Sequence, residues 1–194
     1  MLGFCLWKVI KVNSLKINPK IEKETMWFYG YFIVGITSVA VLISFLKFGL
    51  SSLFIKAMIL NCILIVVSFI DFQHQVIPNN MVIITLLSGI LFTFLCDITI
   101  VNSLIGMFVG GGVLFLLALV PNVMGGGDIK WMFALGSFLG TQKVMVALFL
   151  AFIFAAVISI LLLVFKIKGR KDHIPFGPFL ALGCFASFHI IFLL

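Results

Sequence analysis

Two aspartates stand at the ends of apolar segments in a chain that contains few other acidic residues. Asp71 follows the apolar segment NCILIVVSFI, and Asp128 lies between three glycines and the segment IKWMFALGSFLG. The whole chain has only 6 Asp and Glu residues among 194. Because acidic side chains at membrane depth are costly and usually functional, this pair indicates chemistry at a membrane.

Two carboxyl groups that hold a water molecule between them can hydrolyse a peptide bond. One carboxylate takes a proton from the water, and the other, protonated, polarises the scissile carbonyl group. Like charges at close range cannot both ionise, so such a pair shares one proton. Outside the polar N-terminal arm, Asp97 falls at the opposite end of a span and Asp172 lies in a basic loop. Asp71 and Asp128 therefore predict an aspartic protease that works at a membrane surface.

Each aspartate also has a simpler explanation, which the residues alone leave open. Asp128 can be the N-cap of a helix that starts at Ile129, with the glycines as a flexible linker. Asp71 can be a solvated residue at the end of a helix.

The residues next to both aspartates fit the proteolytic interpretation. Three glycines remove side chains ahead of Asp128, so that an extended peptide backbone can approach. A proline stops the helix after Asp71, and a second Pro-rich turn leads into the last apolar segment on the same face. A lysine after Asp128 either favours its ionisation or extends to the lipid headgroups. The residues that we expect to shape the site are Gly125, Gly126, Gly127, Lys130, Pro78, Asn79, Pro175, Gly177 and Pro178.

The elements that position these residues are membrane spans. Hydrophobic residues make up 63% of the chain and charged residues only 10%, far from the balance of a soluble domain. We predict an all-α polytopic bundle of about seven spans at 27–46, 53–70, 81–96, 103–120, 129–140, 144–165 and 176–194. The fifth has only 12 residues, against the ~20 that cross a bilayer, so it is tilted, half-inserted or continuous with the sixth.

The distribution of positive charge predicts the orientation of the bundle. With the N-terminus in the cytoplasm, ten basic residues fall on the cytoplasmic side and only Lys47, Lys56 and Lys143 on the other. This arrangement places both aspartates on the cytoplasmic face of a plasma or inner membrane. The net charge of +7 then reflects topology and attraction to lipid headgroups, so no nucleic-acid partner is expected. The ten are Lys8, Lys11, Lys16, Lys20, Lys23, Lys130, Lys166, Lys168, Arg170 and Lys171.

Two units are expected along the chain, a basic interfacial arm at 1–25 and a transmembrane peptidase domain at 26–194. The four cysteines (Cys5, Cys62, Cys96 and Cys184) are far apart and include no Cys-x-x-Cys pair. Zinc ligands normally occur in such close pairs, so we expect no metal and no cofactor.

Three segments resemble the type IV prepilin peptidases. These are FIDFQHQVIPN at 69–79, GGGDIK at 125–130, which is similar to the G-x-G-D motif of that family, and IPFGPFLALG at 174–183. They occur in the family's order. The resemblance implies that Asp71 and Asp128 are the catalytic pair. It also implies that the substrate is a prepilin or pseudopilin, cut at the cytoplasmic membrane surface after a glycine that precedes its apolar N-terminal helix.

The chain departs from many members of that family at its N-terminal end. Those members carry a cytoplasmic domain with two Cys-x-x-Cys pairs and methylate the new terminus with S-adenosylmethionine. The 25-residue arm has no such pairs, so we do not expect efficient N-methylation.

Two other functions share some of these features. A proton-coupled transporter also uses intramembrane acids and broken helices, but no inverted repeat is evident. A presenilin-like intramembrane protease shares G-x-G-D, yet its Tyr-Asp and Pro-Ala-Leu motifs are not found in this sequence.

Overall fold

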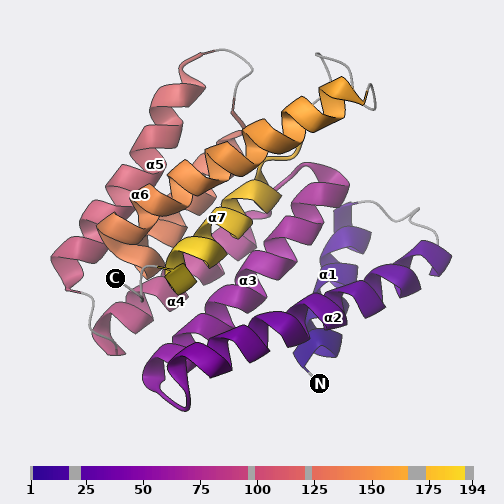
Figure 1. Cartoon of the computed structure of the whole chain (residues 1–194), viewed down its shortest axis with the longest axis horizontal. Helices are drawn as coiled ribbons and strands as arrows, with labels where there is room; N and C mark the ends of the chain where they lie inside the picture. The colour runs from indigo at the N-terminus through magenta and orange to yellow at the C-terminus, as the bar shows by residue number, and fades with distance from the viewer. Residues whose placement is uncertain (1, 18–22, 96–98, 121–123, 166–173, 191–194) are drawn as a thin grey trace.

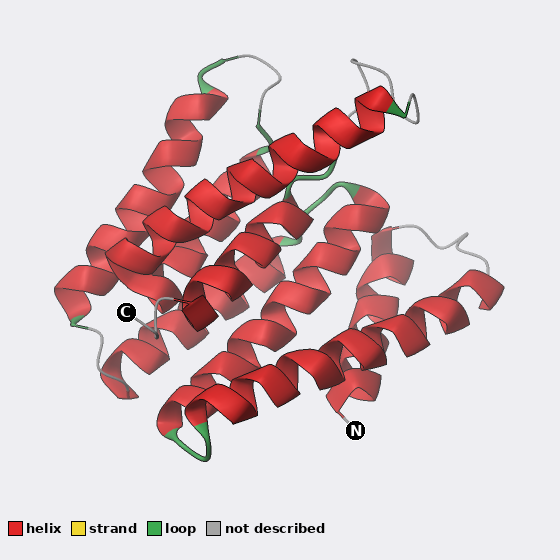
Figure 2. Cartoon of the chain, viewed as in Figure 1, coloured by secondary structure: helices red, strands yellow, loops and turns green. Residues whose placement is uncertain are grey.

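The fold is all-α, as the sequence predicts. The computed structural model describes residues 2–17, 23–95, 99–120, 124–165 and 174–190, and within these ranges it forms seven helices and no strand (Figures 1 and 2). The helices are α1 (Leu2–Ile17), α2 (Lys23–Phe48), α3 (Ser52–His74), α4 (Asn79–Leu95), α5 (Ile100–Ala118), α6 (Gly126–Val164) and α7 (Gly177–Ile190).

Six of these helices are apolar enough for a membrane protein. In the described part of the chain, four are long enough to cross a bilayer: Gly30–Phe48 within α2, together with α3, α5 and α6. The apolar helices α4 and α7 are shorter. Helices suit lipid because each backbone N–H and C=O group pairs within its own segment. A multi-pass membrane bundle is thereby confirmed.

The predicted fifth and sixth segments are two arms of one helix, α6, which bends sharply at Gly140. This residue has φ 72° and ψ 176°, which is not a helical conformation. A positive φ of this kind is readily adopted by glycine and rarely by other residues. In the first arm, Gly127 lies beside Ile77, near the end of α3 that carries Asp71. In the second arm, Phe152 stacks near Phe176, close to that same end. The two arms therefore run in opposite directions, and the short fifth segment is one leg of a hairpin.

Glycines bring α5 and the first arm of α6 into direct backbone contact. A Cβ added to Gly106 would lie 2.7 Å from the carbonyl oxygen of Gly136, and one added to Gly110 would lie 2.8 Å from that of Met132. Small residues four apart allow two helix backbones to approach this closely in a membrane. The second arm packs in the same way on α7, where Gly183 faces Ala147 and Ala151.

The N-terminal helix packs on the outside of the bundle. Gly3 faces Val34, and Trp7 covers Gly30, so α1 runs antiparallel to α2. Leu6 and Ile10 are buried, and α1 contacts both α2 and α3. The predicted lipid contact of this arm stays a prediction. Asp97, Asp172, His173 and the basic residues of 166–173 lie outside the described residues.

Candidate active site

Asp71 is buried in the last turn of α3. Only 5% of it is exposed, so the explanation as a solvated helix-end residue is wrong. The helix ends where Gln75 takes a left-handed conformation and donates its backbone N–H to the Asp71 carbonyl oxygen at 2.8 Å. The side-chain carboxyl group faces the start of α7, where its Oδ2 accepts a hydrogen bond of 2.9 Å from the N–H of Gly177.

The first turn of α7 is suited to hold a carboxyl group. The first N–H groups of a helix have no partner within it, and the helix dipole favours negative charge there. Gly177 uses such an N–H group for Asp71. A Cβ at this position would lie 2.6 Å from Oδ2 and 2.9 Å from Cγ of Asp71, so only glycine fits without moving the carboxyl group.

Asp128 occupies the first turn of α6 and does not cap it. The helix starts three residues earlier than expected, with Gly125 as the N-cap, which makes Asp128 the third helical residue. Its carboxyl group reaches back to a backbone hydrogen bond from Gly125. An acid at the third position commonly satisfies the N-cap N–H in this way. The proposed N-cap role of Asp128 is therefore wrong, and the neighbouring glycines belong largely to the helix.

The fold brings the two aspartates to one end of the bundle. The carboxyl group of Asp71 interacts electrostatically with that of Asp128. Ile77, in the turn after α3, packs against Gly127, where a Cβ would lie 3.2 Å from the Ile77 Cβ. Asp128 is 9% exposed, and its Oδ1 is buried without a hydrogen-bond partner among the described residues. One carboxylate oxygen thus stays available for a water molecule or a substrate.

Four other predicted site residues lie at or just before the starts of α4 and α7. The carbonyl oxygen of Pro78 accepts hydrogen bonds from the N–H groups of Met81 and Val82, so Pro78 directly precedes the first turn of α4. Asn79 is exposed in the first turn of α4. Pro175 and Pro178 flank Gly177 and are half-buried.

Two predicted residues lie away from the carboxyl groups. Lys130 is exposed one turn into α6, which agrees with the alternative in which it extends towards the lipid headgroups and not towards Asp128. Gly126 faces open space, because a Cβ there would meet no atom within 4 Å.

Two further residues near the aspartates were not predicted as site residues. His74 follows Asp71 by three positions and Trp131 follows Asp128 by three, which places each on the same helix face as its aspartate. His74 Nε2 and Trp131 Nε1 are both buried without a hydrogen-bond partner among the described residues. The spacing from the aspartates is a sequence signal for both, and His74 also lies within the segment at 69–79 that resembles the prepilin peptidases.

The described side chains do not form a metal centre. Across the described ranges, no group of three or more His, Cys, Asp or Glu residues is placed to hold a metal ion. Cys5, Cys62 and Cys184 are free thiols, whereas Cys96 lies outside the described part.

Similarity to known proteins is concentrated in the part of the chain that carries both aspartates. The model of the Type IV leader peptidase family matches residues 58–160, just over half of the chain. No solved structure gives a significant match.

The similar curated proteins are named prepilin leader peptidase/N-methyltransferase. The one from Aeromonas salmonicida (strain A449) is 31% identical over 136 residues, 66% of this chain and 47% of its own length. The one from Legionella pneumophila is 31% identical over 165 residues, 81% of this chain and 58% of its own length. The one from Bacillus subtilis (strain 168) is 26% identical over 151 residues. The chain spans about half the length of these relatives.

The matched region includes the end of α3 with Asp71, the turn that packs on Gly127, and the first turn of α6 with Asp128. The family resemblance and the helical bundle therefore agree, and the chain belongs to the type IV leader peptidase family, a family of aspartic peptidases.

Proposed function

We propose that this protein is a membrane aspartic endopeptidase in which Asp71 and Asp128 activate a water molecule to cut the leader peptide of a prepilin or pseudopilin. The observation that carries the proposal is that the fold collects two buried, electrostatically coupled carboxyl groups at one end of the bundle. A proton-coupled transporter is less well supported, because coupling sites lie near the middle of the membrane.

The proposed mechanism follows from the surroundings of the two carboxyl groups. The pair carries one proton, since two close carboxylates cannot both ionise. The unpartnered Oδ1 of Asp128 offers an acceptor for the attacking water. As the water oxygen bonds to the scissile carbon, its proton passes to the carboxylate, and the protonated partner donates to the carbonyl oxygen. Collapse of the tetrahedral intermediate breaks the C–N bond. The leaving amine takes a proton from one carboxyl group, and a hydroxyl group of the intermediate returns a proton to the other, so the pair again carries one proton.

Substrate access is proposed from the cytoplasmic side. Lys47, Lys56 and Lys143 are the basic residues predicted on the opposite side. Lys47 donates to the carbonyl oxygen of His189 and Lys143 lies 4.8 Å from the Phe188 ring centre, both at the far end of α7 from Gly177. The aspartates therefore lie at the other end, where the sequence places most positive charge. This agrees with a cytoplasmic site under the positive-inside rule.

Cleavage of a defined peptide tests the proposal. The purified full chain in lipid nanodiscs is incubated with a peptide that has a basic leader, a glycine at the junction and an apolar segment of about 20 residues. We expect one cut after the glycine, mapped by mass spectrometry. Asp71→Asn and Asp128→Asn should each lower kcat by about 1,000-fold or more, because Asn keeps the size but carries no transferable proton. Wild-type turnover in either folded variant would refute the dyad.

The same experiment decides whether the chain also methylates. The relatives carry N-methyltransferase in their names, and we expect this chain to cleave without efficient methylation. With S-adenosylmethionine present, the mass of the new N-terminal fragment should stay unchanged. A gain of one methyl group that depends on this chain would contradict that expectation.

A further inference from the structure

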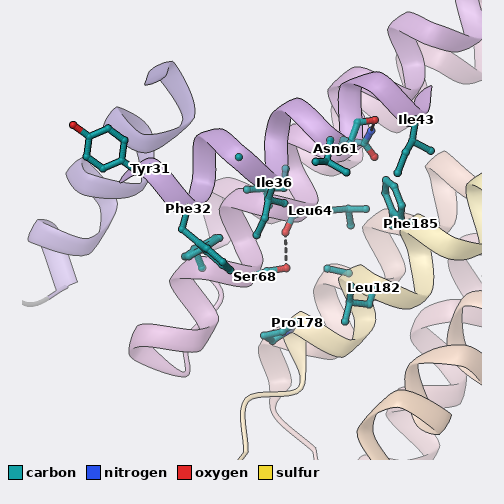
Figure 3. Close-up of a pocket in the computed structure, with 16 residues that line it drawn as sticks. Tyr31, Phe32, Ile36, Ile43, Asn61, Leu64, Ser68, Pro178, Leu182 and Phe185 are labelled. Carbon is teal, nitrogen blue, oxygen red and sulfur yellow. Dashed lines mark hydrogen bonds between the residues drawn. The ribbon is translucent and has the colours of Figure 1, made fainter. Parts of the chain in front are cut away.

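An apolar groove runs along the bundle between α2, α3 and α7 (Figure 3). Its volume is about 770 Å³, and its lining is almost entirely apolar. One end is formed by Phe32, Ser68 and Pro178, and the other by Ile43, Asn61 and Phe185 (Figure 3). From Asn61 to Ser68, the groove follows α3 for seven residues, a rise of about 10 Å, or two helical turns.

One end of the groove lies next to the candidate active site. Ser68 precedes Asp71 by three residues, less than one turn of α3, and Pro178 directly follows Gly177, whose N–H holds the Asp71 carboxyl group. A substrate peptide that extends from the two aspartates along this side of the bundle would therefore enter the groove. The groove then leads away from the aspartates, along helices that lie within the membrane.

The surface of the groove suits a helix better than a lipid chain. Gly35, Ala40, Ser68 and Ala181 contribute small side chains from three different helices. Small residues allow two helix backbones to approach closely in a membrane. At Gly35 the space is open, because a Cβ there would meet no atom within 4 Å. The larger Phe32 and Leu182 line the same groove and are more than half exposed.

A buried polar atom lies at the far end of the groove. Asn61 is 3% exposed, and its Nδ2 donates to Ser44 Oγ at 2.9 Å. Its Oδ1 is buried and accepts no hydrogen bond from the described residues. By contrast, the hydroxyl group of Ser68 is satisfied by the Leu64 carbonyl at 2.6 Å (Figure 3). A buried acceptor without a donor costs free energy, which a hydroxyl or amide donor on an incoming helix would recover.

We infer that this groove binds an apolar membrane helix of the substrate, the segment that continues directly from the scissile bond. This inference rests on the proposed peptidase function and names the surface that selects its substrate. The groove holds the apolar helix against α2, α3 and α7 while the two aspartates act on the bond at its end. Most of the affinity comes from packing in the groove, and the polar leader contributes less.

Filling the groove tests this binding surface. Gly35→Leu places a side chain in the groove without a clash in the fold, and Gly112→Leu is its matched control on α5, where a Cβ also meets no atom within 4 Å. Two substrates are compared, the helix-bearing peptide and a short peptide that ends a few residues after the junction. We expect Gly35→Leu to raise KM for the helix-bearing peptide about tenfold, equivalent to about 1.4 kcal/mol, and to leave kcat/KM for the short peptide unchanged.

The outcomes separate this inference from the proposed function. If the wild type cuts neither peptide, the peptidase proposal fails. If it cuts both and Gly35→Leu behaves like Gly112→Leu, the groove inference fails while the peptidase proposal stands.

Photocrosslinking gives a readout that does not need turnover. A photoreactive residue at Leu182, in the Asp128→Asn background, should crosslink to the helix of the bound peptide. The same residue at Phe115, an exposed position on α5, should not. Crosslinks from Leu182 only to lipid or to a second copy of the chain would overturn the inference.

Discussion

At the scale of single residues, the site depends on two carboxyl groups with different supports. Asp71 is held by an N–H group at the start of a helix, whereas Asp128 lies within the first turn of its own helix and keeps one oxygen unpartnered among the described residues. Burial of an unpartnered charged oxygen costs several kcal/mol, so this arrangement is explained better by function than by stability. The two supports are independent, which makes them separately testable.

Gly177→Ala tests the support of Asp71. The new methyl group would lie 2.6 Å from the carboxylate oxygen, so either Asp71 or the start of α7 has to move. We expect kcat to fall about 100-fold, because a displacement of about 1 Å in a catalytic group can cost that much. Turnover of the leader peptide measures kcat, with Gly112→Ala as the control. An unchanged kcat in Gly177→Ala would show that the carboxyl group is not held at this position.

At the scale of helices, backbone contact between α5 and α6 sets the position of Asp128. Gly110 faces the carbonyl oxygen of Met132, one turn after Asp128, and the bend at Gly140 returns the chain along α7. In lipid there is little hydrophobic force between helices, so close packing of small residues provides much of the association. The glycines therefore position the catalytic end as well as join the helices.

Gly110→Ala tests this contact. A Cβ at Gly110 would lie 2.8 Å from a backbone oxygen, which cannot rotate away. Alanine favours a helix by about 1 kcal/mol over glycine, but overpacking of this kind costs about 1–3 kcal/mol. We expect Gly110→Ala to lower both thermal stability and kcat, and Gly112→Ala, which faces open space, to keep or raise stability. Equal stability of the two variants would contradict the packing role.

At the scale of the whole molecule, charge and contacts predict the orientation in the membrane. The turn between α2 and α3 lies at the end of α3 opposite Asp71, and Leu50 in that turn is 90% exposed. Gly126 lies at the aspartate end. If the aspartates face the cytoplasm, these two positions lie on opposite sides of the membrane.

Cysteine labelling tests the orientation. In a variant without the four natural cysteines, Leu50→Cys should react with a membrane-impermeant maleimide in intact cells. Gly126→Cys should react only after permeabilisation. The reverse pattern would place the site on the outer face and exclude a cytoplasmic leader peptidase.

The sequence by itself determined the class of the protein and its two acidic residues. Apolar segments in lipid have to form helices, because each backbone group needs a partner within the segment, and composition therefore predicts the all-α bundle. The scarcity of acids singled out Asp71 and Asp128, since charge in an apolar segment is rarely kept without a role.

The tertiary structure alone decided how these parts meet. The hydrogen bond from Gly177 to Asp71 joins residues 106 positions apart, and no local pattern encodes such a pair. The sequence also left open whether the short fifth segment crosses the membrane by itself. The chain reverses direction after this segment, and that reversal depends on the φ of a single glycine, Gly140. The sequence also did not predict the correct start of α6. Three successive glycines have weak helix propensity, and the packing of Gly127 on Ile77 and the carboxyl group of Asp128 help to stabilise that first turn.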